Sequence, residues 1–131
     1  MAYGHSATFA QPFAEVLGSV REALAGQGFG IVSEVDIAAT LRNKIGVEIE
    51  PQVILGACNP TFANRALAAE PGIGLLLPCN VVVRATGTST VVEMVDPGIL
   101  VELTENPELE SIADEVGLRL AAAMEALRAA G

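Results

Sequence analysis

Residues 53–83, VILGACNPTFANRALAAEPGIGLLLPCNVVV, place a helix-start signal between two apolar segments that each contain one cysteine. The apolar residues 52–57 predict a buried strand that ends at Cys58. Asn59-Pro60 predicts a helix start, because asparagine can cap free backbone amides and proline fits the first helical turn. That helix should run to about Glu70. The stretch therefore predicts a strand and a helix that meet at the first cysteine.

The second apolar segment and the flanking sequence complete the pattern. Residues 73–85 predict another buried strand, bent at Pro78 because proline cannot donate in a central ladder. Upstream, we expect a strand over 3–9, a helix over 12–27, a strand over 29–35, and a short helix that Asp36 caps and Gly46 ends. Downstream, we expect a hairpin turn at 87–89, a strand over 90–95, a turn at 96–98, and a long helix opened by Asn106 and Pro107.

This order of elements indicates an α+β fold. It reads β-α-β-(short α)-β-α-β-β-α, with neighbouring strands that favour antiparallel pairing. We expect an antiparallel-rich sheet with helices packed on one face, in a single domain over residues 1–131.

Composition limits the possible partners. Sixteen acidic against seven basic residues give a net charge of −9, which opposes binding to a nucleic acid or an anionic membrane. The start of the chain lacks the pattern of a secretory signal, so a cytoplasmic location is expected. The apolar stretch 72–83 is too short to span a bilayer.

The two cysteines are the candidates for chemistry. Cys58 directly precedes a predicted helix N-terminus, where the helix dipole stabilises an anionic sulfur and could activate a nucleophile. Cys79 lies 21 positions later and could join it if the two strands are close. The alternative is that both are reduced, buried thiols that act as small apolar side chains, which their apolar neighbours favour.

Other polar residues carry weaker signals. His5 is the single histidine and has no neighbouring carboxylate in sequence, so a metal site is not expected, nor is any cofactor. Asp36, Glu93 and Asp96 each have a cap, strand-surface or turn explanation. The glycines at 26, 28 and 30 follow a helix, which is the wrong context for a dinucleotide-binding loop.

Three segments together, GFGIVSEVDIAATLRNKIG, VILGACNPTFANRALAAEPGIGLLLPCNVVV and VVEMVDP, resemble the family named domain of unknown function 302. The resemblance implies a small bacterial or archaeal α+β domain, similar to the TATA-box-binding-protein fold in strand and helix order and usually a homodimer. The family's recurrent positions fall on Asp36, Gly56, Cys58, Asn59, Pro60, Leu77, Pro78, Cys79 and Pro97. Gln52 departs from the pattern, where an aromatic residue is expected.

Three functions are compatible with these observations. The first is a noncatalytic homodimeric module that binds a small ligand or a partner near ILGACNP and LLLPC, with Cys58, Asn59, Cys79 and Asp36 as candidate contacts. The second is a thiol-based redox enzyme or carrier in which Cys58 attacks and Cys79 resolves. The third is an assembly protein that acts through its dimer surface. No complete catalytic constellation is visible in the sequence, which favours the first and third.

Overall fold

The computed structural model describes residues 2–131 and contains one five-stranded sheet. The strands are β1 (Gly4–Phe9), β2 (Gly30–Asp36), β3 (Gln52–Cys58), β4 (Cys79–Thr86) and β5 (Ser89–Val95). Their order across the sheet is β1-β5-β4-β3-β2, and every neighbouring pair is antiparallel. The predicted α+β class and antiparallel sheet are confirmed.

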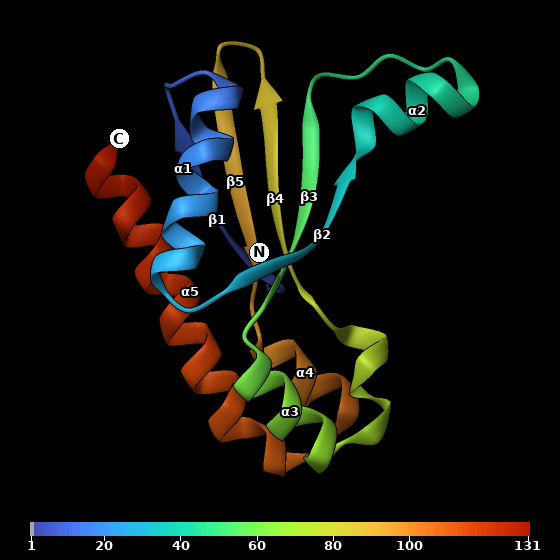
Figure 1. Ribbon diagram of the computed structural model, residues 1–131, viewed down its shortest axis with the longest axis vertical. Coiled ribbons are helices and arrows are strands. Elements are labelled where there is room, and N and C mark those ends of the chain that lie inside the picture. The colour runs from blue at the N-terminus through green and yellow to red at the C-terminus, as the bar shows by residue number, and fades with distance from the viewer. Residues whose placement is uncertain (1) are drawn as a thin grey trace.

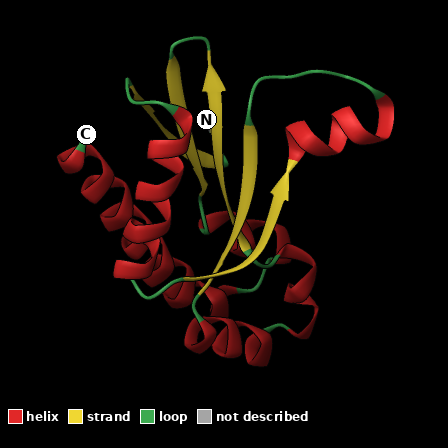
Figure 2. Cartoon of the chain, turned by 45° about the horizontal axis from the view of Figure 1, so that its top comes forward, coloured by secondary structure: helices red, strands yellow, loops and turns green. Residues whose placement is uncertain are grey.

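Five α-helices and two 3-10 helices connect and cover the strands (Figure 1). The α-helices are α1 (Phe13–Gly26), α2 (Ile37–Ile45), α3 (Pro60–Ala69), α4 (Gly98–Thr104) and α5 (Glu110–Ala130). The 3-10 helices are η1 (Pro71–Leu76) and η2 (Pro107–Leu109). The helices α1 and α5 lie along one face of the sheet, while α3 and α4 gather at its lower end (Figures 1 and 2).

Side-chain alternation divides the sheet into two faces. On the covered face, cross-strand neighbours such as Leu55 and Val81 are fully buried and pack with the helices. On the opposite face, which we call the open face, Ile54 pairs with Val82 and Glu93 lies beyond Val82. The core therefore lies between the covered face and the long helices.

The helix starts that rest on local side-chain caps are confirmed. The Oδ1 atom of Asn59 accepts hydrogen bonds from the amides of Thr61 and Phe62, at 3.1 and 3.2 Å. The Oδ1 atom of Asp36 accepts one from the amide of Ala39, at 2.9 Å. Each cap satisfies amides that a helix start leaves without partners.

The strand predicted over 73–85 is wrong in its first half. Residues 71–76 form η1, and β4 begins only at Cys79. Leu75 is 92% exposed, so this part of the apolar run is not a buried strand. A short apolar run does not distinguish a strand from a helical turn, and Pro71 favours the latter because its fixed φ suits a first turn.

The turn and helix predicted after residue 95 also need correction. Asp96 accepts a hydrogen bond from the amide of Gly98 at 2.9 Å, as its turn role requires, but the chain then enters α4. Asn106-Pro107 opens a 3-10 turn, and the long α-helix begins only at Glu110. The helix α4 was missed because it is only seven residues long.

The helix α2 differs from the others in its burial. It projects from the end of β2, away from the helical layer (Figures 1 and 2). Although Ile37, Leu41 and Ile45 lie at helical spacing, none of the described residues of α2 is buried. Across residues 2–131, no helix combines the length and apolar character needed to cross a lipid bilayer.

Candidate functional site

The strand ladder brings the two cysteine segments together at the lower end of the sheet. Cys79 pairs with Ala57, and both are buried on the covered face. Cys58 is the next and last residue of β3, and its side chain is partly buried. Both cysteines are free thiols. The two segments are therefore adjacent, as the sequence suggested they could be.

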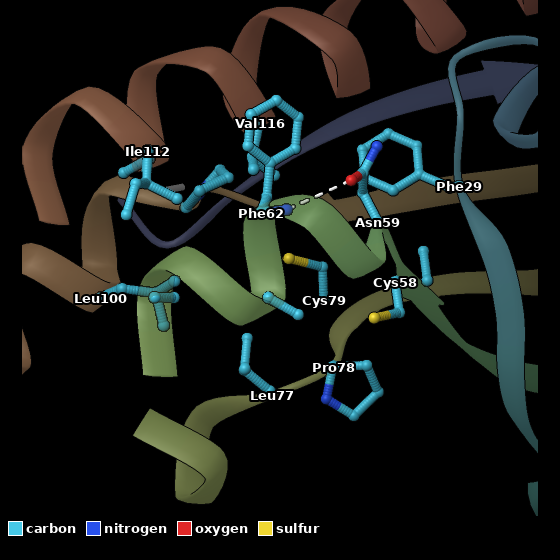
Figure 3. A pocket seen from close by; sticks show the side chains of 15 residues that line it. Phe29, Cys58, Asn59, Phe62, Leu77, Pro78, Cys79, Leu100, Ile112 and Val116 are labelled. Carbon is cyan, nitrogen blue, oxygen red and sulfur yellow. Dashed lines mark hydrogen bonds between the residues drawn. The ribbon is translucent and has the colours of Figure 1, made fainter. Parts of the chain in front are cut away.

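A small apolar cavity, which we call the inner cavity, lies beside both cysteines (Figure 3). Its volume is about 40 Å³, room for no more than a few water-sized molecules. The lining comes from β3, α3, α5 and the segment before β4, and includes Phe29, Cys58, Phe62, Leu77, Cys79 and Val116. The space is too small for most ligands and reads as a packing defect beneath α3.

A larger opening, which we call the outer groove, adjoins the inner cavity. Its volume is about 300 Å³. The two spaces share wall residues Leu77, Pro78, Cys79, Pro97 and Leu100. The remaining wall is supplied by η1, α4 and the adjoining strand ends, through Leu75, Leu76, Asn80, Val95, Ile99 and Leu103. Most of these side chains are aliphatic, so the groove suits apolar groups.

The exposed rim of the groove is unusually apolar. Leu75 is 92% exposed and Leu103 is 62% exposed, on opposite elements of the groove wall. Water-exposed leucines that flank one concave surface are a typical feature of a binding site. Asn80 is the polar side chain in this wall, and it could fix the orientation of a bound molecule.

Cys79 is poorly suited to act as a nucleophile. Burial, together with a smaller effect of the neighbouring Cys58, raises the pKa of its thiol from the ordinary value of 9.0 to about 11. The thiol is therefore protonated at neutral pH. In this form Cys79 contributes a small apolar surface to both spaces.

Asn59 serves a structural role at the start of α3. Its side-chain oxygen accepts hydrogen bonds from the backbone amides of Thr61 and Phe62, and its Nδ2 donates one to the carbonyl oxygen of Gly28 at 3.2 Å. The backbone carbonyl of Asn59 accepts the amide of Ala63 at 2.9 Å. The first-turn amides that could have stabilised an anionic Cys58 are thus already bonded.

The structure does not bring Asp36 to this site. Asp36 pairs with Val53, whereas Gly30, at the other end of β2, pairs with Cys58. At about 3.3 Å per residue, Asp36 lies near 20 Å from the cysteines along the strand. Its carboxylate caps α2 instead. Gln52, at the same distant end of β3, lines neither the inner cavity nor the outer groove.

The other polar candidates are also dispersed. The Nε2 atom of His5 lies 3.6 Å from Oδ2 of Asp96, a carboxylate neighbour that the sequence did not suggest. Glu93 instead pairs with Arg84, at 2.7 Å between Oε1 and Nε. Within residues 2–131, no group of three or more His, Cys, Asp or Glu side chains is placed to hold a metal ion.

Sequence reasoning missed Phe62 and the two arginines around it. Phe62 lines the inner cavity, and the guanidinium carbons of Arg119 and Arg65 lie 5.1 and 5.5 Å from its ring centroid. Nη1 of Arg119 also donates to the carbonyl oxygen of Gln27, at 3.2 Å. These contacts join α3 to α5 and close the cavity on that side. No local sequence pattern predicts these contacts, because Arg119 is far from Phe62 in the sequence.

Comparisons with known proteins agree with this arrangement. A crystal structure of an uncharacterized conserved DUF302 protein from Bacillus stearothermophilus is similar, with a TM-score of 0.89 and 29% sequence identity. The match covers 97% of this chain and 99% of that chain. Among curated proteins, no similar sequence was found. The profile of the family described as Domain of unknown function DUF302 matches residues 5–127. Because this match spans nearly the whole described chain, the protein belongs to the DUF302 family.

Proposed function

We propose that the protein is a noncatalytic, homodimeric cytoplasmic module that binds a small apolar molecule in the outer groove. The observation that carries the proposal is the groove itself, about 300 Å³ of aliphatic wall beside the cysteine segments. This volume is at the lower limit for small-molecule sites, which are mostly apolar with a few polar groups. The exposed leucines of the rim would be covered when the groove is filled.

The arrangement of the cysteines favours binding over thiol chemistry. An attacking thiolate needs an accessible sulfur, and a resolving thiol must reach the same disulfide. Cys79 is buried, with a pKa raised to about 11. Cys58 and Cys79 lie on neighbouring strands and are both free thiols. We therefore assign Cys79 to the wall of the outer groove and Cys58 to the wall of the adjoining inner cavity.

Binding can be tested with N-phenyl-1-naphthylamine, a neutral apolar probe whose fluorescence rises when it leaves water. We expect saturable binding by the wild type. In Leu75→Gln/Leu103→Gln, both rim leucines become polar, and removing their apolar surface should weaken binding about tenfold. Both side chains are exposed, so the fold should be kept.

Leu118→Gln is the matched control. Leu118 is 71% exposed on α5 and does not line the groove, so this variant should bind the probe as the wild type does. If the wild type and the double variant bound the probe with equal affinity, the probe would bind elsewhere, and the outer groove would not be the binding site.

A further inference from the structure

The segment from Val32 to Glu50, which we call the arm, is the least buried part of the fold. It comprises most of β2, all of α2 and the loop that leads to β3. Within the described chain, α2 buries none of its residues. The arm carries several large apolar side chains in contact with water: Val32 at 64%, Val35 at 43%, Ile45 at 67%, Val47 at 43% and Ile49 at 38% exposure.

A nine-residue helix without buried side chains is unstable by itself. Isolated helices shorter than about 12–15 residues are marginal in water, and most helical stability in proteins comes from packing an apolar face. The Asp36 cap and Gly46, at φ +68°, define the ends of α2 but supply no apolar packing. In addition, β2 is an edge strand, and edge strands readily accept a partner. We therefore expect a partner to bury the exposed apolar side chains of the arm.

The charge pattern of the arm identifies what covers it. Arg42 and Lys44 lie in the last turn of α2, whereas Glu48 and Glu50 follow Gly46 in the loop. An isologous two-fold contact sets the same patch of two copies in opposite directions. Such a contact centred near Gly46 brings the basic last turn of α2 in one copy onto the acidic loop of the other, and it does so twice.

From this pattern we infer that two copies of the chain associate through their arms, with Ile45 and Val47 at the centre and Lys44 of each copy facing Glu48 of the other. The inference rests on the homodimeric part of the proposed function and adds its surface. Glu48 is the better partner for the lysine because Glu50 already accepts a hydrogen bond from the amide of Gly87, at 2.8 Å.

The test compares dimer dissociation constants by size-exclusion chromatography with light scattering and by native mass spectrometry. The wild type should be a dimer at micromolar concentration. Ile45→Asp places a charge at the centre of the contact and should raise the Kd at least about tenfold. Leu118→Asp is the control, since Leu118 is also highly exposed but lies on α5, and it should leave the Kd unchanged.

A charge exchange tests the two-fold arrangement itself. Lys44→Glu faces Glu48 of the other copy with a like charge and should raise the Kd several-fold. Adding Glu48→Lys to the same chain restores opposite charges at both symmetry-related contacts and should return the Kd close to its wild-type value. A different partner protein would not respond to this exchange by recovering binding.

The contrary outcomes are distinct. If Ile45→Asp dimerises as tightly as the wild type, the arm is not the interface, although the homodimer stands. If Lys44→Glu is not rescued by Glu48→Lys, the two-fold arrangement is wrong. If the wild type is monomeric at all concentrations tested, both the homodimer and the arm interface are wrong. Probe binding in the outer groove is then decided separately by the fluorescence measurement.

Discussion

At the scale of single residues, Cys79 shows how a position in the ladder decides chemistry. In the sequence only Cys58 has a local reason for altered reactivity, and the pairing of Cys79 with Ala57 then shows that Cys79 is enclosed on the covered face. Sequence could indicate that Cys58 precedes a helix, because that relation is local. The sequence also predicted the Asn59 cap, and the structure adds that this cap occupies amides beside Cys58 that could otherwise have stabilised a thiolate.

The raised pKa of Cys79 predicts a stability loss at high pH. The folded state holds the thiol proton up to about pH 11, whereas the unfolded chain releases it near the ordinary value of 9.0. The stabilisation is thus complete below pH 9 and is lost as the pH rises toward 11, by roughly 2–3 kcal/mol. Urea unfolding of the reduced protein between pH 7.5 and 10.5 should show this decline.

Cys79→Ala isolates the effect of the thiol. Other groups that titrate in the same range are present in both proteins, so they cancel in the difference between the two unfolding free energies. We expect that difference to shrink as the pH rises above 9. A difference independent of pH would mean that the thiol is solvated in the folded state.

At the scale of elements, the sequence predicted structure wherever the cause was local. The starts of α2 and α3 follow from Asp36 and Asn59, whose side chains bond to amides two or three residues away. By contrast, two elements that line the outer groove were not predicted: most of η1 was expected to be strand, and α4 was missed beyond the turn at 96–98. Their apolar runs are too short for periodicity to distinguish the alternatives. The groove was therefore missed although the cysteine segments beside it were found.

Gly56 in β3 lies where β2 and the segment before β4 approach this strand closely. A Cβ atom at this position would collide with the side chain of Ser33 in β2 and would lie 2.6 Å from Cγ of Pro78. The proline ring cannot turn aside as a flexible side chain could. Gly56→Ala should therefore destabilise the protein by about 1–3 kcal/mol, as overpacked sites do, measured by urea unfolding.

Gly18→Ala is the comparison for this prediction. Gly18 lies in α1, and an added Cβ would have no neighbour within 4 Å among the described atoms. This variant should be as stable as the wild type or more stable by about 0.5–1 kcal/mol, because alanine favours a helix over glycine. If Gly56→Ala were as stable toward urea as Gly18→Ala, the close packing of Pro78 on β3 would be refuted.

At the scale of the whole molecule, the fold separates its two candidate surfaces. The outer groove lies at the lower end of the sheet, next to Cys79, whereas α2 extends from the opposite end of β2 (Figure 1). One end thus has the apolar outer groove, and the other has the arm with its exposed apolar and charged side chains. Because of this separation, we expect the proposed ligand binding and the proposed self-association to be altered independently by mutation.

The arm makes a prediction about hydrogen exchange in the intact protein. The amides of α2 have little apolar packing to protect them within one chain, because no described residue of that helix is buried. By contrast, α5 buries a full stripe of side chains, among them Ile112, Leu120 and Leu127. At protein concentrations well below the dimer Kd, α2 should exchange quickly while α5 stays protected. Raising the concentration should protect α2 and leave the exchange of α5 unchanged, with Ile45→Asp showing fast exchange of α2 at every concentration. Protection of α2 that is strong in dilute solution and does not change with concentration would show that the helix is stabilised within its own chain, and that the arm has no need of a second copy.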